Sequence, residues 1–130
     1  MNGWEAESDA ESLLNGLGIG PEFHYSQMGN LLGAQKVKVL LAQALFGNPD
    51  ILLLDEPTRG IDVGAKYEIY QLIIDLANEG KVVIMVSSEM PELLGVCDRI
   101  LVMSGGRLAG EVDAKNTTQE EIMTLAAKYV

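Results

Sequence analysis

The sequence predicts an α/β fold built around a parallel sheet. Two mainly apolar segments, 51–54 and 82–87, are bounded by turn-forming residues. Their composition is typical of strands that are buried on both faces of a parallel sheet. The segment 63–78 between them carries apolar residues on one helical face. Strand, helix and strand in this order predict a βαβ unit, and 130 residues are enough for one domain.

Further helices and a hairpin are expected before and after this unit. Asp62 is a suitable N-cap for the helix 63–78, and Pro91 suits the start of a short helix. Overlapping capping signals at 117–121 predict a last helix that reaches about Tyr129. The remaining expected elements are helices at 5–15, 31–46 and 90–96 and hairpin strands at 99–103 and 107–112 around Ser104-Gly105-Gly106.

Composition and charge exclude some classes of function. The net charge of −10 argues against a nucleic-acid surface, because phosphate contacts need a basic stripe. The single cysteine, Cys97, fits a reducing compartment. No apolar run reaches the length of a membrane span, and no signal peptide opens the sequence. We therefore expect a soluble, cytoplasmic protein whose membrane role, if it has one, comes through a partner.

Asp55 and Glu56 form an acidic pair where the first strand ends. Ligands of open α/β sheets bind beyond the carboxyl ends of the strands. Carboxylates are costly to desolvate there unless they hold a cation or handle a proton. The pattern has the form of a Walker B strand, with Asp55 holding Mg²⁺ and Glu56 orienting or deprotonating an attacking water. Ser88 follows the second strand at the same edge of the sheet. The alternative for Asp55 and Glu56 is that they only cap the next helix.

With these segments placed, the chain resembles the second half of an ATP-binding cassette (ABC) ATPase domain over essentially all of its length. Residues 54–66, Leu-Asp-Glu-Pro-Thr-Arg-Gly-Ile-Asp-Val-Gly-Ala-Lys, look like the second cassette of sugar-importer ATPases of the ribose and galactose/methyl galactoside type. Residues 87–95 and 98–103 continue this likeness. The sugar-importer likeness thus extends over about 49–130, whereas about 1–57, and 37–50 most clearly, are similar to ABC-F proteins, which are soluble paired cassettes that act on ribosomes. We infer a mosaic that is joined between residues 49 and 58.

The resemblance implies a partial P-loop NTPase fold of the ABC type, with three layers. Its parallel sheet core would lack the P-loop strand, and a β-hairpin and a helix would end the chain. The whole chain, 1–130, would be a partial ABC ATPase domain, with 1–30 as the end of the helical subdomain and 31–130 as the rest. Because the central strand is missing, we expect either that 99–103 pairs directly with 82–87 or that the free edge pairs with another copy.

The resemblance also implies roles for particular residues in a complete cassette that binds ATP and Mg²⁺. The family's signature sequence, Leu-Ser-Gly-Gly, appears here as Leu31-Leu32-Gly33-Ala34, without the serine hydroxyl. Small residues at a helix start can let backbone N–H groups approach an anion, although most such starts are only tight turns. The residues that would contact nucleotide are Leu32, Gly33, Ala34, Gln35, Asp62 and Ser88, with Asp55 as the metal ligand and Glu56 as the catalytic residue.

The sequence contains no Gly-x-x-x-x-Gly-Lys-Ser/Thr phosphate loop, so we expect the isolated chain not to hydrolyse ATP. The first hypothesis is the C-terminal half of an ABC-transporter ATP-binding subunit that drives carbohydrate import. Its partners would be the missing cassette half, a second cassette and a membrane permease at the inner face of the cell membrane. The alternatives are a fragment of an ABC-F-like translation factor and a non-catalytic fragment or chimera that keeps the fold.

Overall fold

The computed structural model describes residues 3–130, which divide into two compact units. The first unit ends at Val86 and the second spans Ser87–Val130. The elements of the first unit are α1 (Ala6–Gly16), two short 3-10 helices (Pro21–Phe23 and Met28–Asn30), α2 (Gly33–Leu45), β1 (Ile51–Asp55), α3 (Val63–Asn78) and β2 (Val82–Val86). The elements of the second unit are α4 (Met90–Val96), β3 (Arg99–Ser104), β4 (Arg107–Asp113) and α5 (Gln119–Ala126).

The predicted βαβ unit is confirmed in the first unit. Strands β1 and β2 are parallel and in register, from the pair Ile51 and Val82 to the pair Asp55 and Val86. Lys81 connects the segments that lead into the two strands. Its Nζ donates to Asn48 Oδ1 at 2.9 Å and to the Pro49 carbonyl at 2.6 Å. The strands therefore start and finish level with each other.

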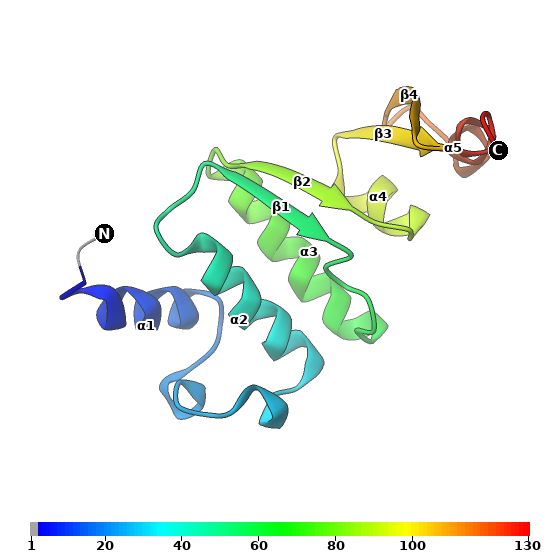
Figure 1. The fold of residues 1–130 in the computed structure, drawn as a ribbon. Helices are drawn as coiled ribbons and strands as arrows, with labels where there is room; N and C mark the ends of the chain where they lie inside the picture. The colour runs from blue at the N-terminus through cyan, green and yellow to red at the C-terminus, as the bar shows by residue number, and fades with distance from the viewer. Residues whose placement is uncertain (1–2) are drawn as a thin grey trace. The chain divides into compact units, whose positions relative to one another are not determined.

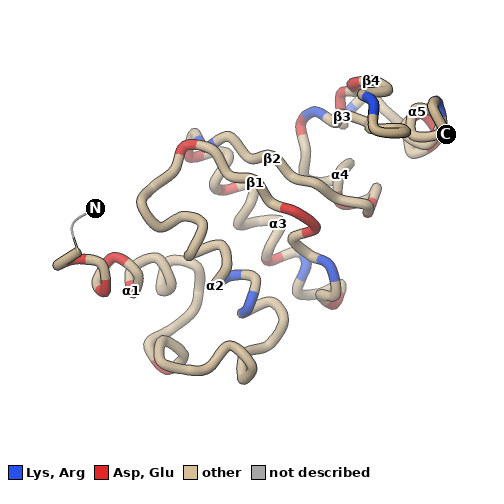
Figure 2. The backbone as a smooth tube through the Cα atoms, in the orientation of Figure 1, with Lys and Arg blue, Asp and Glu red and all other residues tan. Residues whose placement is uncertain are grey.

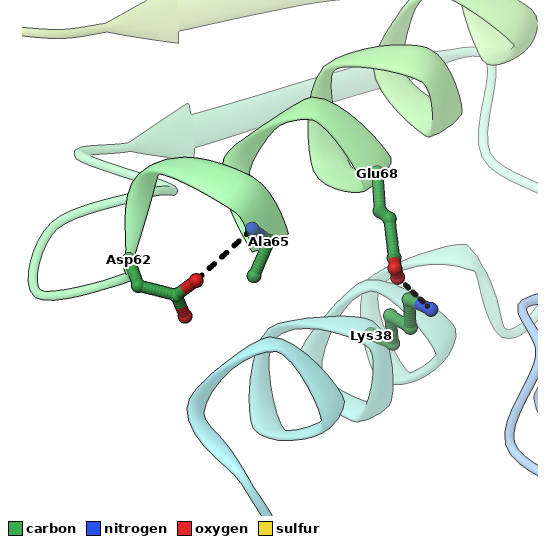
Figure 3. A network of polar contacts seen from close by, with 4 residues as sticks. All are labelled: Lys38, Asp62, Ala65 and Glu68. Carbon is green, nitrogen blue, oxygen red and sulfur yellow. Dashed lines mark hydrogen bonds and ion pairs between the residues drawn. The ribbon is translucent and has the colours of Figure 1, made fainter.

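Helices α2 and α3 lie on one side of this two-stranded sheet (Figure 1). Leu41, Ala42 and Leu45 of α2 pack with Leu52 of β1 and Leu76 of α3 to form the core of the unit. An ion pair of 2.8 Å between Lys38 Nζ and Glu68 Oε2 also joins the two helices (Figure 3). On this face of the sheet Leu52 is therefore buried, and Leu54, Val83 and Met85 are half-buried.

The prediction that both strands are buried on both faces is wrong. The opposite side chains form what we call the bare sheet face, and they are 51–69% exposed. The residues of the bare sheet face are Ile51, Leu53, Val82, Ile84 and Val86. The unbroken apolar runs indicated two-sided burial, but the helices of this unit pack on one side only (Figure 1).

In the second unit, β3 and β4 form an antiparallel hairpin. Its two-residue loop, Gly105-Gly106, has positive φ at both positions, as a tight hairpin turn requires. The core consists of Ile100 and Val102 from β3 together with Ala114 and Ile122. The hairpin and α4 lie where the sequence predicts them, whereas α5 ends at Ala126, before the predicted Tyr129.

The prediction that residues 99–103 pair with 82–87 is wrong. Strand β3 pairs with β4, and in the part of the chain that the structure describes β2 is hydrogen-bonded to β1. A hairpin closed by two residues loses little chain entropy, which favours the local pairing of β3 with β4. Pairing of the free edge with another copy stays a prediction. No helix among residues 3–130 is long and apolar enough to cross a bilayer.

Candidate functional site

The acidic pair lies at the carboxyl end of β1. Asp55 is the last residue of the strand and is exposed, and Glu56 follows it and is half-buried. The Glu56 amide donates to the Val86 carbonyl at 2.8 Å, which holds the ends of both strands together. Figure 2 shows this acidic segment in red directly after β1. The two carboxylates therefore stand where open α/β sheets bind their ligands.

Glu56 adopts a left-handed backbone conformation, with a φ of 46°. A residue with a Cβ is disfavoured in this region, and Pro57 restricts the residue before it further. The turn is closed by the Arg59 amide, which donates to the Glu56 carbonyl at 3.1 Å. Strained backbone of this kind clusters at functional sites. The sequence gives no sign of this conformation, because glutamate has no preference for positive φ.

The loop after the acids is anchored by a buried threonine. Thr58 is only 1% exposed, and its carbonyl accepts from the Ile61 amide at 3.1 Å. Gly60 supplies the positive φ of 77° that this turn needs. Asp62 then caps α3, because its Oδ2 accepts from the Ala65 amide at 3.3 Å (Figure 3). The predicted N-cap is confirmed.

The start of α2 lies against this loop. A Cβ placed on Gly33 would come within 3.0 Å of Ile61 Cδ1, so the backbone of α2 lies close to the Ile61 side chain. Leu32 is the N-cap of α2 and is 74% exposed, but its side chain has no oxygen that could accept from the helix. Its amide donates to Gln35 Oε1 at 2.9 Å, whereas Ala34 and Gln35 are half-buried.

Ser88 belongs to the second unit, where it lies in the turn between β2 and α4. Its side chain is exposed, whereas Ser87 before it is half-buried. The Ser87 hydroxyl donates to Glu92, and its oxygen accepts from the Glu89 amide at 3.1 Å. Glu92 is 2% exposed. The sequence gives no sign of this burial, because an acid in the first helical turn usually faces water.

Burial raises the pKa of the Cys97 thiol, and the negative charges of Glu92 and Asp98 raise it further. The thiol is therefore protonated near neutral pH and is a poor nucleophile.

The predicted site residues thus lie in three places. Asp55 and Glu56 are together at the end of β1, Gly33 with its neighbours is beside the loop that leads to Asp62, and Ser88 is in the turn before α4. The first two places belong to the first unit and the third to the second unit.

The residues present fit Mg²⁺ in part. No group of three or more His, Cys, Asp or Glu able to hold a metal occurs among residues 3–130. An exposed carboxylate such as Asp55 nevertheless suits Mg²⁺, which keeps several waters and takes one or two protein carboxylates together with phosphate oxygens. The backbone cradle that would hold the phosphates is not encoded in this sequence.

Solved structures with the same fold are ABC transporter cassettes. A nucleotide-free ATP-binding cassette superposes with a TM-score of 0.81 at 23% identity, covering 95% of this chain and 47% of that one. A metal-chelate type ABC transporter in an inward-facing conformation also gives 0.81, at 22% identity, covering 90% of this chain and 47% of that one. The chain therefore has the fold of part of an ABC-type P-loop NTPase domain, as predicted.

The sequence comparisons agree with the fold. The family described as "ABC transporter" matches residues 2–59. Over this segment the chain is similar to ATP-binding cassette proteins.

The similar curated proteins are more specific. The galactose/methyl galactoside import ATP-binding protein MglA of Pasteurella multocida is 52% identical over 130 residues, covering 100% of this chain and 26% of the relative. MglA of Clostridium perfringens is 57% identical over 122 residues, covering 94% of this chain and 24% of the relative. The chain thus spans about a quarter of the length of these relatives. The junction between residues 49 and 58 stays a prediction, because each identity is an average over its whole alignment.

Proposed function

We propose that the chain forms the C-terminal half of a cassette in the ATP-binding subunit of a sugar importer, where it supplies one wall of the nucleotide site. The observation that carries the proposal is the acidic pair Asp55-Glu56 at the carboxyl end of β1. Support for the transported class comes from the relatives, which are named for galactose and methyl galactoside import.

In this proposal each predicted residue has one task. Bound Mg²⁺ supplies positive charge that offsets the phosphate oxygens. Asp55 would hold that ion, directly or through water, and Glu56 would orient or deprotonate the attacking water. Ser88 donates a hydrogen bond to a phosphate oxygen, but a hydroxyl cannot carry a proton as an imidazole does.

The remaining predicted contacts lie in the first unit. The start of α2, formed by Leu32, Gly33, Ala34 and Gln35, would face the nucleotide bound by an opposite cassette. Asp62 would lie beside that interface while it caps α3. We infer that 1–130 is one partial cassette domain, with 1–30 as the end of its helical subdomain.

The bare sheet face supports a missing cassette half as the partner. Parallel sheets are covered on both faces in nearly all proteins, yet this face of β1 and β2 is 51–69% exposed. The solved cassettes are about twice the length of the part that this chain covers. In the complete transporter we place the subunit in the cytoplasm, against a membrane permease and a second cassette.

A non-catalytic module is the second candidate, and the N-cap of α2 favours it. Leu32 stands where the family has serine, so neither a cap nor a phosphate contact can come from this side chain. An ABC-F-like translation factor fragment is the third candidate, and the likeness of residues 37–50 to that family is its support.

The proposal is tested by transplanting the chain. We expect the Pasteurella multocida relative, with this chain in place of its aligned segment, to hydrolyse Mg-ATP at a rate below that of the parent. Glu56→Gln in this chimera should lower kcat by about a hundredfold or more, because a general base is lost. The exposed Glu120→Gln is the matched control and should change little.

The isolated 130-residue chain should show no hydrolysis above background. A chimera without activity would favour the non-catalytic module. If the chimera still hydrolyses ATP after Glu56→Gln, the role assigned to Glu56 is wrong.

A further inference from the structure

Glu92 is the one charged residue among the buried side chains of residues 3–130. Only 2% of it is exposed, although it occupies the first turn of the short helix α4. Moving a carboxylate out of water is costly unless hydrogen bonds compensate. A buried glutamate at the surface end of a seven-residue helix therefore needs a reason.

The contacts of Glu92 lead to the turn before α4. Its Oε2 accepts a hydrogen bond from the Ser87 hydroxyl. The oxygen of the same hydroxyl accepts from the Glu89 amide at 3.1 Å, and the Glu89 carbonyl accepts from the Leu93 amide at 3.2 Å. These bonds form a closed chain that joins the helix to the residues on both sides of Ser88.

The direction of the bonds matters. A serine hydroxyl has one proton and two lone pairs, and it rotates to suit its partners. Because the Ser87 hydroxyl donates its hydrogen to the Glu92 carboxylate, the lone pairs on its oxygen can accept from the Glu89 N–H. A hydroxyl that donates to a charged group also becomes a better acceptor. Without an acceptor at position 92, the Ser87 hydroxyl is free to turn away from this amide.

We propose that Glu92 is a positioning residue, which holds the Ser87–Glu89 turn in the one conformation that presents the Ser88 hydroxyl outward. Ser88 is exposed, whereas Ser87 and Glu89 are half-buried, and the Glu89 amide donates to the Ser87 oxygen. The part of this inference that concerns phosphate rests on the proposed function, whereas the part that concerns the turn does not.

The turn is tested in the 130-residue chain by amide hydrogen exchange measured by NMR. Ser87→Ala removes the central hydroxyl, and we expect it to speed exchange of the Glu89 amide about tenfold, the factor that corresponds to one hydrogen bond. Glu92→Leu should have the same effect. Glu92→Gln should restore protection to within about threefold of the parent, because its amide oxygen can still accept from Ser87. Glu120→Gln, an exposed acid in the same unit, should change nothing.

A merely structural role for Glu92 gives a different pattern. If Glu92→Leu speeds exchange throughout β3 and β4, at Ile100 and Val112 for example, the effect is loss of the unit and the positioning role is wrong. Ser87→Ala keeps the test decisive where Glu92→Leu fails to fold. A Glu89 amide that stays protected in Ser87→Ala would overturn the proposal.

The phosphate part is tested in the chimera with the Pasteurella multocida relative. Glu92→Leu and Ser88→Ala should each lower kcat about tenfold while KM for ATP stays within about twofold, because one hydrogen bond to a reacting phosphate is weakened. Glu92→Gln should keep most of the activity. A parent chimera without hydrolysis would contradict the proposed function, whereas the exchange result would still decide whether Glu92 holds the turn. If Glu92→Leu keeps the full kcat while Ser88→Ala lowers it, the positioning role of Glu92 is wrong, although the phosphate contact of Ser88 stands.

Discussion

At the scale of the residue, Glu56 combines a proposed catalytic carboxylate with an unfavourable backbone. Its φ of 46° costs about 1–2 kcal/mol for a residue with a Cβ. The hydrogen bond from its amide to the Val86 carbonyl at 2.8 Å holds the backbone in the left-handed conformation. At position 56 the residue that the proposed activity needs therefore lowers the stability of the fold.

This opposition predicts the order of two variants of Glu56. Both Glu56→Ala and Glu56→Gly lose the carboxylate, so both should abolish hydrolysis in the chimera described above. Of the two, only glycine relieves the left-handed strain and so stabilises the folded state. Glycine also raises the entropy of the unfolded chain, which offsets part of this stabilisation. We expect Glu56→Gly to exceed Glu56→Ala in unfolding free energy by about 0.5–1 kcal/mol, measured by urea titration. Equal stabilities would mean that the turn relaxes when the side chain is removed.

Some single residues could be predicted from the sequence and others could not. The N-caps Asp62 and Thr118 were predictable, because each puts a side-chain oxygen three residues before an amide that it accepts from. The burial of Glu92 and the left-handed conformation of Glu56 were not. The conformation of Glu56 is held by Val86 from another strand, and the contact of Glu92 with Ser87, five residues earlier, has no recognised sequence pattern.

At the scale of the element, α2 begins with a defect that substitution can repair. Leu32 is its N-cap, has no side-chain acceptor and is 74% exposed. Gln35 already occupies the third helical position and accepts from the Leu32 amide at 2.9 Å. Half of a capping box is therefore in place.

Serine at position 32 should complete the box. We expect Leu32→Ser to raise the unfolding free energy by about 1 kcal/mol, because a free N–H of the first turn gains an acceptor and little apolar area is lost. Leu40→Ser, in the exposed middle of the same helix, is the control and should be slightly destabilising. Thermal unfolding followed by circular dichroism would distinguish them. A destabilising Leu32→Ser would show that this leucine packs in a way its exposure conceals.

Element types, most boundaries and the pairing of successive strands follow from local pattern, whereas a more distant pairing does not. The spans of α3 and α4 agree with prediction because periodicity, a cap or an early proline marks each end. The pairing of β3 with β4 was predicted correctly, because the short Gly105-Gly106 loop indicates a hairpin. The expected pairing of 99–103 with 82–87 was wrong, because strand composition does not encode a distant partner.

At the scale of the whole molecule, the bare sheet face and the net charge oppose each other. The face carries five apolar side chains in alternation, Ile51, Leu53, Val82, Ile84 and Val86, next to strand edges without a third strand in the described part of the chain. Such a surface favours association. A net charge of −10 keeps copies apart, but only over the distance at which salt leaves the repulsion unscreened.

This balance predicts self-association that increases with salt. We expect sedimentation velocity to show a larger average mass in 0.5 M NaCl than in 0.02 M NaCl, because the Debye length falls several-fold while apolar attraction remains. Leu53→Lys and Ile84→Thr should each restore the monomer at high salt. Leu53→Lys also lowers the negative charge, so its effect could not come from added repulsion. Met123→Lys, which replaces an exposed methionine on α5, should leave association unchanged. If the assembly persists in both sheet variants but disappears in Met123→Lys, the contact lies in the second unit and the bare sheet face is not the surface that copies share.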